Sequence, residues 1–215
     1  MRYVPNDKYT IAWFKLAECV AKGEKEKAFG VYRLLMHSLE DQAYAHQLEG
    51  DLLNAFCDER ANEKYAHAAQ LYYHTNRYKE AASLYEDLIT QIPEERYIQR
   101  LIEIYKQYKT KDIFYSKLIK LAHVLIAKEL YIQVMPLIQE LESSNFNDTV
   151  ILLYTKVIIN LIKNECDQTL IEPFLYKALD YMIAQKNQLQ AFLSMLEQST
   201  YWYQKCCAYI KREDA

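Results

Sequence analysis

The scarcity of turn-forming residues constrains the fold of this chain more than any other feature of its sequence. Only 3 Gly and 4 Pro occur in 215 residues, whereas average usage gives about 12% for the two together. Folds made of many short strands need these residues for tight turns. Apolar residues also recur at intervals of three and four, as on one face of a helix. The sequence therefore predicts an all-α fold of long helices joined by short connectors.

Breaks in this periodicity give a first map of the helices. We expect them near residues 7–22, 24–39, 41–57, 60–75, 78–91, 94–109, 112–128, 130–143, 147–163, 168–185, 188–198 and 200–212. The side chains of Asp7, Asn147 and Asp167 are suited to cap helix starts. Pro136 is expected to move the start of its helix to near Gln133, because proline is tolerated in a first turn. Residues 1–215 are thus expected to form a single helical-repeat domain, with helix 200–212 as a candidate cap.

One window carries a finer pattern of large and small residues. Its positions are Tyr65, Ala68, Ala69, Tyr72, Asn76, Tyr78, Ala81, Tyr85, Leu88 and Pro93. Small residues such as Ala69 and Ala81 let two helices approach closely, Asn76 supports the turn, and Pro93 ends the second helix. The pattern resembles the tetratricopeptide repeat, with residues 62–95 as one complete unit and weaker echoes over residues 5–143. The resemblance implies an antiparallel helix-hairpin array forming a right-handed α-solenoid.

The pairing of the helices changes along the chain. Counting on from the unit at residues 62–95 makes residues 112–128 the second helix of a pair. A later window instead makes them a first helix; its members are Leu118, Leu121, Ala122, Leu125, Val134, Ile138 and Leu141. Either the array shifts phase near residue 110, or its C-terminal half is only repeat-like.

The resemblance also implies a binding surface, because the first helices of such repeats line a concave groove. The positions left after packing are Glu63, Ala66, Gln70 and Tyr73 in one helix, and Arg96, Gln99, Glu103 and Lys106 in the next. We expect this set to bind a peptide or helix of another protein, as in a scaffold or adaptor, with Tyr73 as the anchor. Plain solvent exposure is the competing interpretation.

Within the family, one known use is disfavoured and another stays open. Clamping of a chaperone's C-terminal carboxylate needs Asn and basic residues where this chain has Ala17, Ala66 and Gln70. Adaptor-like helical arrays that resemble the soluble attachment factors of membrane fusion are compatible with the pattern of residues 63–88. The partner itself is not encoded in the sequence.

No pattern typical of a catalytic, cofactor or metal site occurs in the sequence. Gly23, Gly30 and Gly50 are isolated and form no phosphate-binding loop. His67 and His74 share a helix face, but no further ligands accompany them at metal-binding spacing. We therefore expect a protein that is not an enzyme and that uses no cofactor and no metal.

Charge and hydropathy disfavour nucleic acid and membranes as partners. The net charge is −3, which provides no positive field for phosphates. The alternative is a module for RNA or single-stranded nucleic acid at Lys106–Lys120, where Lys106, Lys109, Lys111, Lys117 and Lys120 are interleaved with Tyr105, Tyr108 and Tyr115. Neither a signal peptide nor a run of about 18 apolar residues appears. We expect a cytoplasmic protein without membrane insertion.

Overall fold

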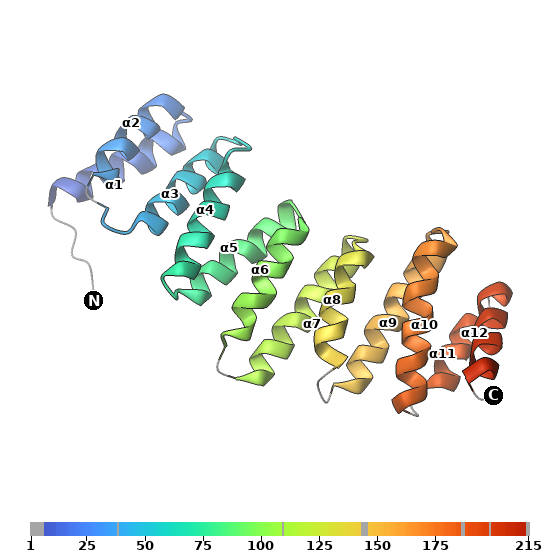
Figure 1. The fold of residues 1–215 in the computed structure, drawn as a ribbon. Coiled ribbons are helices and arrows are strands. Elements are labelled where there is room, and N and C mark those ends of the chain that lie inside the picture. The colour runs from blue at the N-terminus through green and yellow to red at the C-terminus, as the bar shows by residue number, and fades with distance from the viewer. Residues whose placement is uncertain are drawn as a thin grey trace. The chain divides into compact units, whose positions relative to one another are not determined.

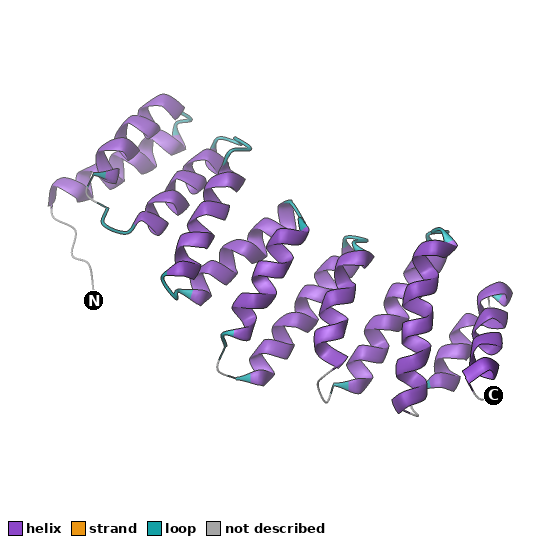
Figure 2. Ribbon diagram, in the orientation of Figure 1, coloured by secondary structure: helices purple, strands orange, loops and turns teal. Residues whose placement is uncertain are grey.

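The computed structural model describes residues 7–37, 39–108, 110–142, 146–185, 188–197 and 199–213. Twelve α-helices and no strand occur in these ranges (Figure 2). The helices pack against their neighbours in sequence as adjacent pairs, which confirms the prediction of an all-α helical array. Most helix bounds lie within two or three residues of the predicted ones. The predicted ends at residues 109, 143 and 198 lie outside the described residues.

The chain divides into two compact units, unit 1 (Met1–Lys109) and unit 2 (Thr110–Ala215), each of which is described by itself. The helices are labelled in Figure 1. Unit 1 contains α1 (Asp7–Ala21), α2 (Lys25–Met36), α3 (Gln42–Ala55), α4 (Ala61–His74), α5 (Tyr78–Gln91) and α6 (Glu95–Lys106). Unit 2 contains α7 (Lys111–Ala127), α8 (Tyr131–Glu142), α9 (Asn147–Lys163), α10 (Gln168–Gln185), α11 (Leu189–Leu196) and α12 (Thr200–Glu213). The expectation of one continuous repeat domain stays a prediction.

Small residues let α3, α4 and α5 pack closely in unit 1. Ala69 of α4 and Ala81 of α5 have no exposed surface, as expected for close-approach positions. Between α3 and α4 the contact is tighter still, because a Cβ added at Gly50 would lie 2.7 Å from the ring of Tyr65. A glycine inside a helix costs about 0.5–1 kcal/mol relative to Ala. At this position the cost is offset by an aromatic ring packed directly on the α3 backbone.

A left-handed residue closes the turn in five of the helix hairpins. These residues have φ between 52 and 71° and follow α1, α3, α4, α7 and α9; they are Gly23, Cys57, Asn76, Glu129 and Glu165. In each turn the next residue donates its N–H to a carbonyl five residues back, as Arg77 does to Tyr72 at 2.8 Å. This bond satisfies a carbonyl at the helix end. The predicted role of Asn76 in its turn is thereby confirmed.

Larger aliphatic side chains fill the core of unit 2. The helices α7 and α8 pack together, as do α9 and α10. All residues of the window that joins residues 112–128 to the following helix are buried, so α7 is the first helix of a pair with α8. Both of the helices α9 and α10 carry large aliphatic side chains without exposed surface; they include Leu153, Val157, Leu161, Leu175 and Leu179.

One predicted helix start in unit 2 is wrong. The helix α8 begins at Tyr131 and not near Gln133, so Pro136 lies inside it. Burial of the Tyr131 side chain favours the earlier start. The N–H that Pro136 lacks would have paired with the carbonyl of Ile132. Because the Ile132 side chain is exposed, water can reach that side of the helix, and the lost bond is tolerated.

The expected capping role of Asn147 is also wrong. Asn147 is the first residue within α9, and no side-chain cap is formed at that helix start. Its side chain instead donates to Gln185 at 2.9 Å and accepts from the hydroxyl of Tyr181 at 2.8 Å, which joins α9 to α10. A side-chain cap that the sequence analysis did not identify lies at α3, where Asp41 accepts from the backbone N–H of Tyr44 at 3.1 Å.

Candidate functional site

A hollow of about 580 Å³ lies between α4 and α6 in unit 1, and we call it the α4–α6 hollow. Its lining combines polar, charged and aromatic side chains from α4, from α6 with the residues preceding it, and from α5. The lining residues are Asn62, Glu63, Ala66, His67, Gln70, Tyr85, Ile92, Glu94, Arg96, Tyr97 and Arg100.

Part of the predicted partner-binding set lines this hollow. Glu63, Gln70 and Arg96 do so, as does Ala66 between them. All three polar residues of this group are exposed, so they are accessible to a partner. The structure therefore brings together side chains from two helices that lie about a repeat length apart in the sequence.

Tyr73, the predicted anchor, is half-buried beside the hollow and is not part of its lining. The guanidinium carbon of Arg100, which does line the hollow, lies 5.1 Å from the centre of the Tyr73 ring. The ring of Tyr78 packs edge-on against Tyr73 at 5.8 Å. Tyr73 thus contacts α5 and α6 while part of its surface remains accessible.

The three remaining predicted residues are exposed on α6 outside the lining. Gln99 donates to Glu95 at 2.8 Å, and Glu103 accepts from Arg100 at 2.6 Å. Lys106 lies in the last turn of α6. These residues lie on α6, which also supplies residues to the lining, but they do not line the hollow themselves.

The predicted positions on α6 differ from the observed lining because the offset between α4 and α6 was one residue too short. Moving by 34 residues, the length of the unit at residues 62–95, takes Asn62, Glu63 and Ala66 to Arg96, Tyr97 and Arg100, all of which line the hollow. The predicted set moved by 33. One residue turns a side chain by about 100° around a helix. The signal for Tyr97 and Arg100 was therefore present in the repeat length.

Charged groups in the hollow are held by local contacts. Arg96 pairs with Glu94 through Nε at 2.5 Å and donates from Nη2 to the Tyr97 hydroxyl at 3.0 Å. Burial raises the pKa of the Tyr85 hydroxyl, while Arg100 acts in the opposite direction. The hollow consequently offers both signs of charge in fixed positions, which suits a polar partner segment.

Two buried polar atoms near the hollow have no hydrogen-bond partner: Oδ1 of Asn62 and Nδ1 of His46. The ring of His46 on α3 stacks on that of His67 at 4.2 Å between ring centres. Burial lowers the pKa of His46, and His67 and Lys64 lower it further. Asn62 Oδ1 is thus a buried acceptor beside the hollow, whereas the exposed polar groups of the lining include Glu63, Gln70 and Arg96. The histidine stack has no local sequence pattern, because its members come from different helices.

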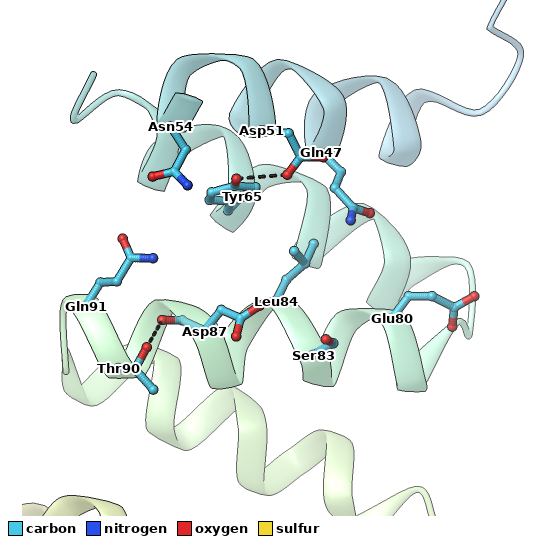
Figure 3. A pocket seen from close by; sticks show the side chains of 10 residues that line it. All are labelled: Gln47, Asp51, Asn54, Tyr65, Glu80, Ser83, Leu84, Asp87, Thr90 and Gln91. Atoms are coloured by element: carbon cyan, nitrogen blue, oxygen red, sulfur yellow. Dashed lines mark hydrogen bonds between the residues drawn. The ribbon is translucent and has the colours of Figure 1, made fainter. Parts of the chain in front are cut away.

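Two further hollows lie on the helices α1, α3 and α5. One, of about 330 Å³, is shown in Figure 3 and is lined by Gln47, Asp51, Asn54, Tyr65, Glu80, Ser83, Leu84, Asp87, Thr90 and Gln91. The other, of about 420 Å³, is mainly apolar and is lined by Trp13, Leu16, Ala17, Val20, Ala21, Asp51, Leu52 and Ala55. Asp51 lines both, and its carboxylate accepts from the Tyr65 hydroxyl at 2.9 Å (Figure 3).

The tyrosines of the Lys106–Lys120 segment are engaged within the protein. Tyr105 is buried, and Tyr108 packs beside it at 5.7 Å between ring centres. Tyr115 packs against Phe114 at 5.0 Å and Phe146 at 5.4 Å. Lys109 lies outside the described residues. The segment also crosses the division between units 1 and 2, so its lysines are not placed as one surface.

In the described part of the chain, no group of three or more His, Cys, Asp and Glu side chains is placed to hold a metal ion. Among the same residues, none of the helices has the length and apolarity that crossing a membrane requires. No protein-family model and no curated protein matches this chain. The fold alone defines its class, an all-α array of paired helices.

Proposed function

We propose that this chain is a non-catalytic protein-interaction scaffold built of tetratricopeptide-like repeats. It binds a peptide or helix of another protein in the α4–α6 hollow, and we place it in the cytoplasm. The single observation that carries the proposal is this hollow, which two helices a repeat length apart line with fixed donors, acceptors and aromatic rings.

The contacts of the hollow suggest how a partner is held. Glu63 and Gln70 of α4 and Arg96 of α6 are exposed polar groups of its lining. Such groups give orientation through hydrogen bonds. Tyr73 and Arg100 stack at the rim, and residues of these two types commonly dominate binding energies at interfaces.

Affinity capture from a cell lysate with the full chain as bait, followed by mass spectrometry, identifies the partner. Filling the hollow with Ala66→Trp should then abolish capture, because Ala66 lines its centre. Gln107→Trp is the matched control, since Gln107 is exposed on α6's C-terminal side and lines none of the three hollows. Equal capture by both variants would contradict the proposal.

A second test addresses the anchor. Truncation of an anchoring aromatic typically costs about 2 kcal/mol or more of binding energy. Tyr73→Ala should therefore weaken capture strongly while the melting temperature changes little, because the ring is only half-buried. Loss of the fold together with binding would make Tyr73 a packing residue.

The alternative, binding of RNA or single-stranded nucleic acid at Lys106–Lys120, has less support because Tyr105 and Tyr115 pack within the protein. Salt titration separates the two functions. A binding constant that falls steeply with salt concentration signals counterion release from phosphates. The proposed protein partner predicts a shallow dependence.

A further inference from the structure

The two hollows on α1, α3 and α5 form a surface of two contrasting halves, which we call the α1–α3–α5 groove. The α1–α3 half is lined by apolar side chains, including Trp13, Val20 and Leu52, with Asp51 as its only charged member. The α3–α5 half is lined mainly by polar side chains, together with Leu84 and the ring of Tyr65 (Figure 3). Because Asp51 belongs to both linings, the two halves meet at its carboxylate.

The charge of this groove has one sign. Its lining contains the carboxylates of Asp51, Glu80 and Asp87 and no Lys, Arg or His. Glu80 forms an ion pair with Arg77 at 3.1 Å, but Asp51 accepts from a neutral hydroxyl. Burial raises the pKa of Asp87, and neighbouring Glu86 raises it further. Within the part of the chain that the structure describes, Glu80 is the one carboxylate of this lining that forms an ion pair.

The packing of α4 against α3 determines where the Asp51 carboxylate lies. Gly50 provides the space in which the Tyr65 ring lies against α3, and the ring hydroxyl then donates to Asp51 at 2.9 Å. A larger residue at position 50 would push the ring away. The carboxylate at the junction of the two halves is thus held in place by a helix glycine and an aromatic ring.

We propose that the α1–α3–α5 groove is a second docking surface, which binds a basic amphipathic segment of a partner protein. Apolar side chains of that segment enter the α1–α3 half, and its Lys or Arg side chains pair with Asp51 and Asp87. Charge complementarity favours a basic segment. The carboxylates of the groove would repel the phosphates of nucleic acid and of anionic lipid. The proposal goes beyond the α4–α6 hollow, because it uses the other helices and a partner of different chemistry.

A displayed library of random helical peptides, panned against the full chain, tests this proposal. The selected peptides should be enriched in Lys and Arg together with Leu, Ile and Phe. Their affinity should fall about tenfold, or about 1.4 kcal/mol, in the Asp51→Asn/Asp87→Asn variant. A similar fall is expected for Ala21→Glu, which places a charge in the apolar half.

Controls separate this surface from the rest of unit 1. Glu26→Gln/Glu59→Gln removes two exposed carboxylates outside all three hollows and should leave peptide affinity unchanged. Ala66→Trp should also leave it unchanged, so failure of the α4–α6 proposal is distinguished from failure of this one. Circular dichroism checks that each variant folds. Selected peptides without basic enrichment, peptides unaffected by the Asn and Glu variants, or loss of binding in Ala66→Trp would each overturn the proposal.

Discussion

The α3–α5 helices of unit 1 and the α9–α10 pair of unit 2 bury their contacts with different kinds of side chain. In unit 1, Ala68, Ala69 and Ala81 are fully buried between helices. In unit 2 the equivalent space is filled by large aliphatic residues such as Leu161 and Leu175, which are also fully buried. In both units these side chains have no exposed surface.

The difference teaches where a helical array can carry binding surfaces. Short side chains between helices leave long polar and aromatic residues free to extend from the helix edges. In unit 1 these edges line the α4–α6 hollow and the α1–α3–α5 groove. In unit 2, large side chains such as those of Leu161 and Leu175 add to the buried apolar surface. The two contacts should therefore respond oppositely to changes of side-chain size.

The largest effect is expected from truncation in unit 2. Leu161→Ala should destabilise unit 2 by about 2–5 kcal/mol, because it removes fully buried atoms and leaves a cavity. Each unit holds one of the two tryptophans, Trp13 and Trp202. Urea denaturation followed by fluorescence in a Trp13→Phe background therefore reports on unit 2. Leu152→Ala, at an exposed position of α9, is the control and should change little.

Enlargement in unit 1 should have the next largest effect. Ala81→Leu is expected to cost about 1–3 kcal/mol, since extra atoms in a closely packed contact force strain. A Trp202→Phe background leaves Trp13 as the reporter of unit 1. Ala66→Leu places the same side chain at a half-buried position of α4 and should be tolerated. Similar losses of stability in the two variants would mean that Ala81 is packed no more closely than Ala66, which lines the α4–α6 hollow.

The third expected effect concerns Gly50→Ala, whose effect on stability should have opposite signs in two backgrounds. In the wild-type chain, Gly50→Ala should destabilise by about 1 kcal/mol, because the added Cβ meets the Tyr65 ring at 2.7 Å. In a Tyr65→Ala background the same change should stabilise by about 0.5–1 kcal/mol, because Ala favours a helix over Gly. Thermal melts of the four chains measure both values. The same sign in both backgrounds would mean that the ring does not limit residue 50.

The smallest expected effect is the pH dependence that one histidine gives to each unit. The pKa of His46 in unit 1 is lowered by burial, His67 and Lys64, and that of His123 in unit 2 by burial and Lys156. A lowered folded-state pKa means that the unfolded chain binds the proton more readily. Stability should therefore be fully present above the unfolded-state pKa of about 6.5 and decline as pH falls through the lowered values.

Glu49 acts in the opposite direction at His46, but the pKa remains lowered, so the decline is expected in both units. Urea midpoints between about pH 7.5 and pH 5, read from the two single-tryptophan backgrounds, measure it in the range where histidine titrates. His46→Gln should flatten the curve of unit 1 alone. An unchanged slope in that variant would exclude His46 as its source.

The sequence predicted the helices well because local spacing determines which helix face is apolar. The same spacing identified Ala69 and Ala81 as buried, and it joined α7 to α8. The starts of α8 and α9 were less predictable, since burial of Tyr131 and the contacts of Asn147 with α10 depend on neighbouring helices. Helix ends are decided by tertiary contacts that local spacing does not contain.

The candidate site was predictable only in part. Glu63, Gln70 and Arg96 were found from the repeat pattern, whereas Arg100 was missed through a one-residue shift in register. Surfaces assembled from helices far apart in sequence have no local signature. The junction at Asp51 needs α1, α3, α4 and α5 together, so no single window of sequence could reveal it.

The left-handed turn residues have a consequence for how such an array can be engineered. Only Gly23 among the five is a glycine; Cys57, Asn76, Glu129 and Glu165 adopt the same backbone region with a Cβ. That region costs a residue other than glycine roughly 1 kcal/mol, and asparagine somewhat less. Replacement of Glu129 and Glu165 by Gly would relieve this strain without altering a core or a groove. Since the stabilities of neighbouring helix pairs add along such an array, these turns offer a way to strengthen the fold without changing the residues that line its hollows.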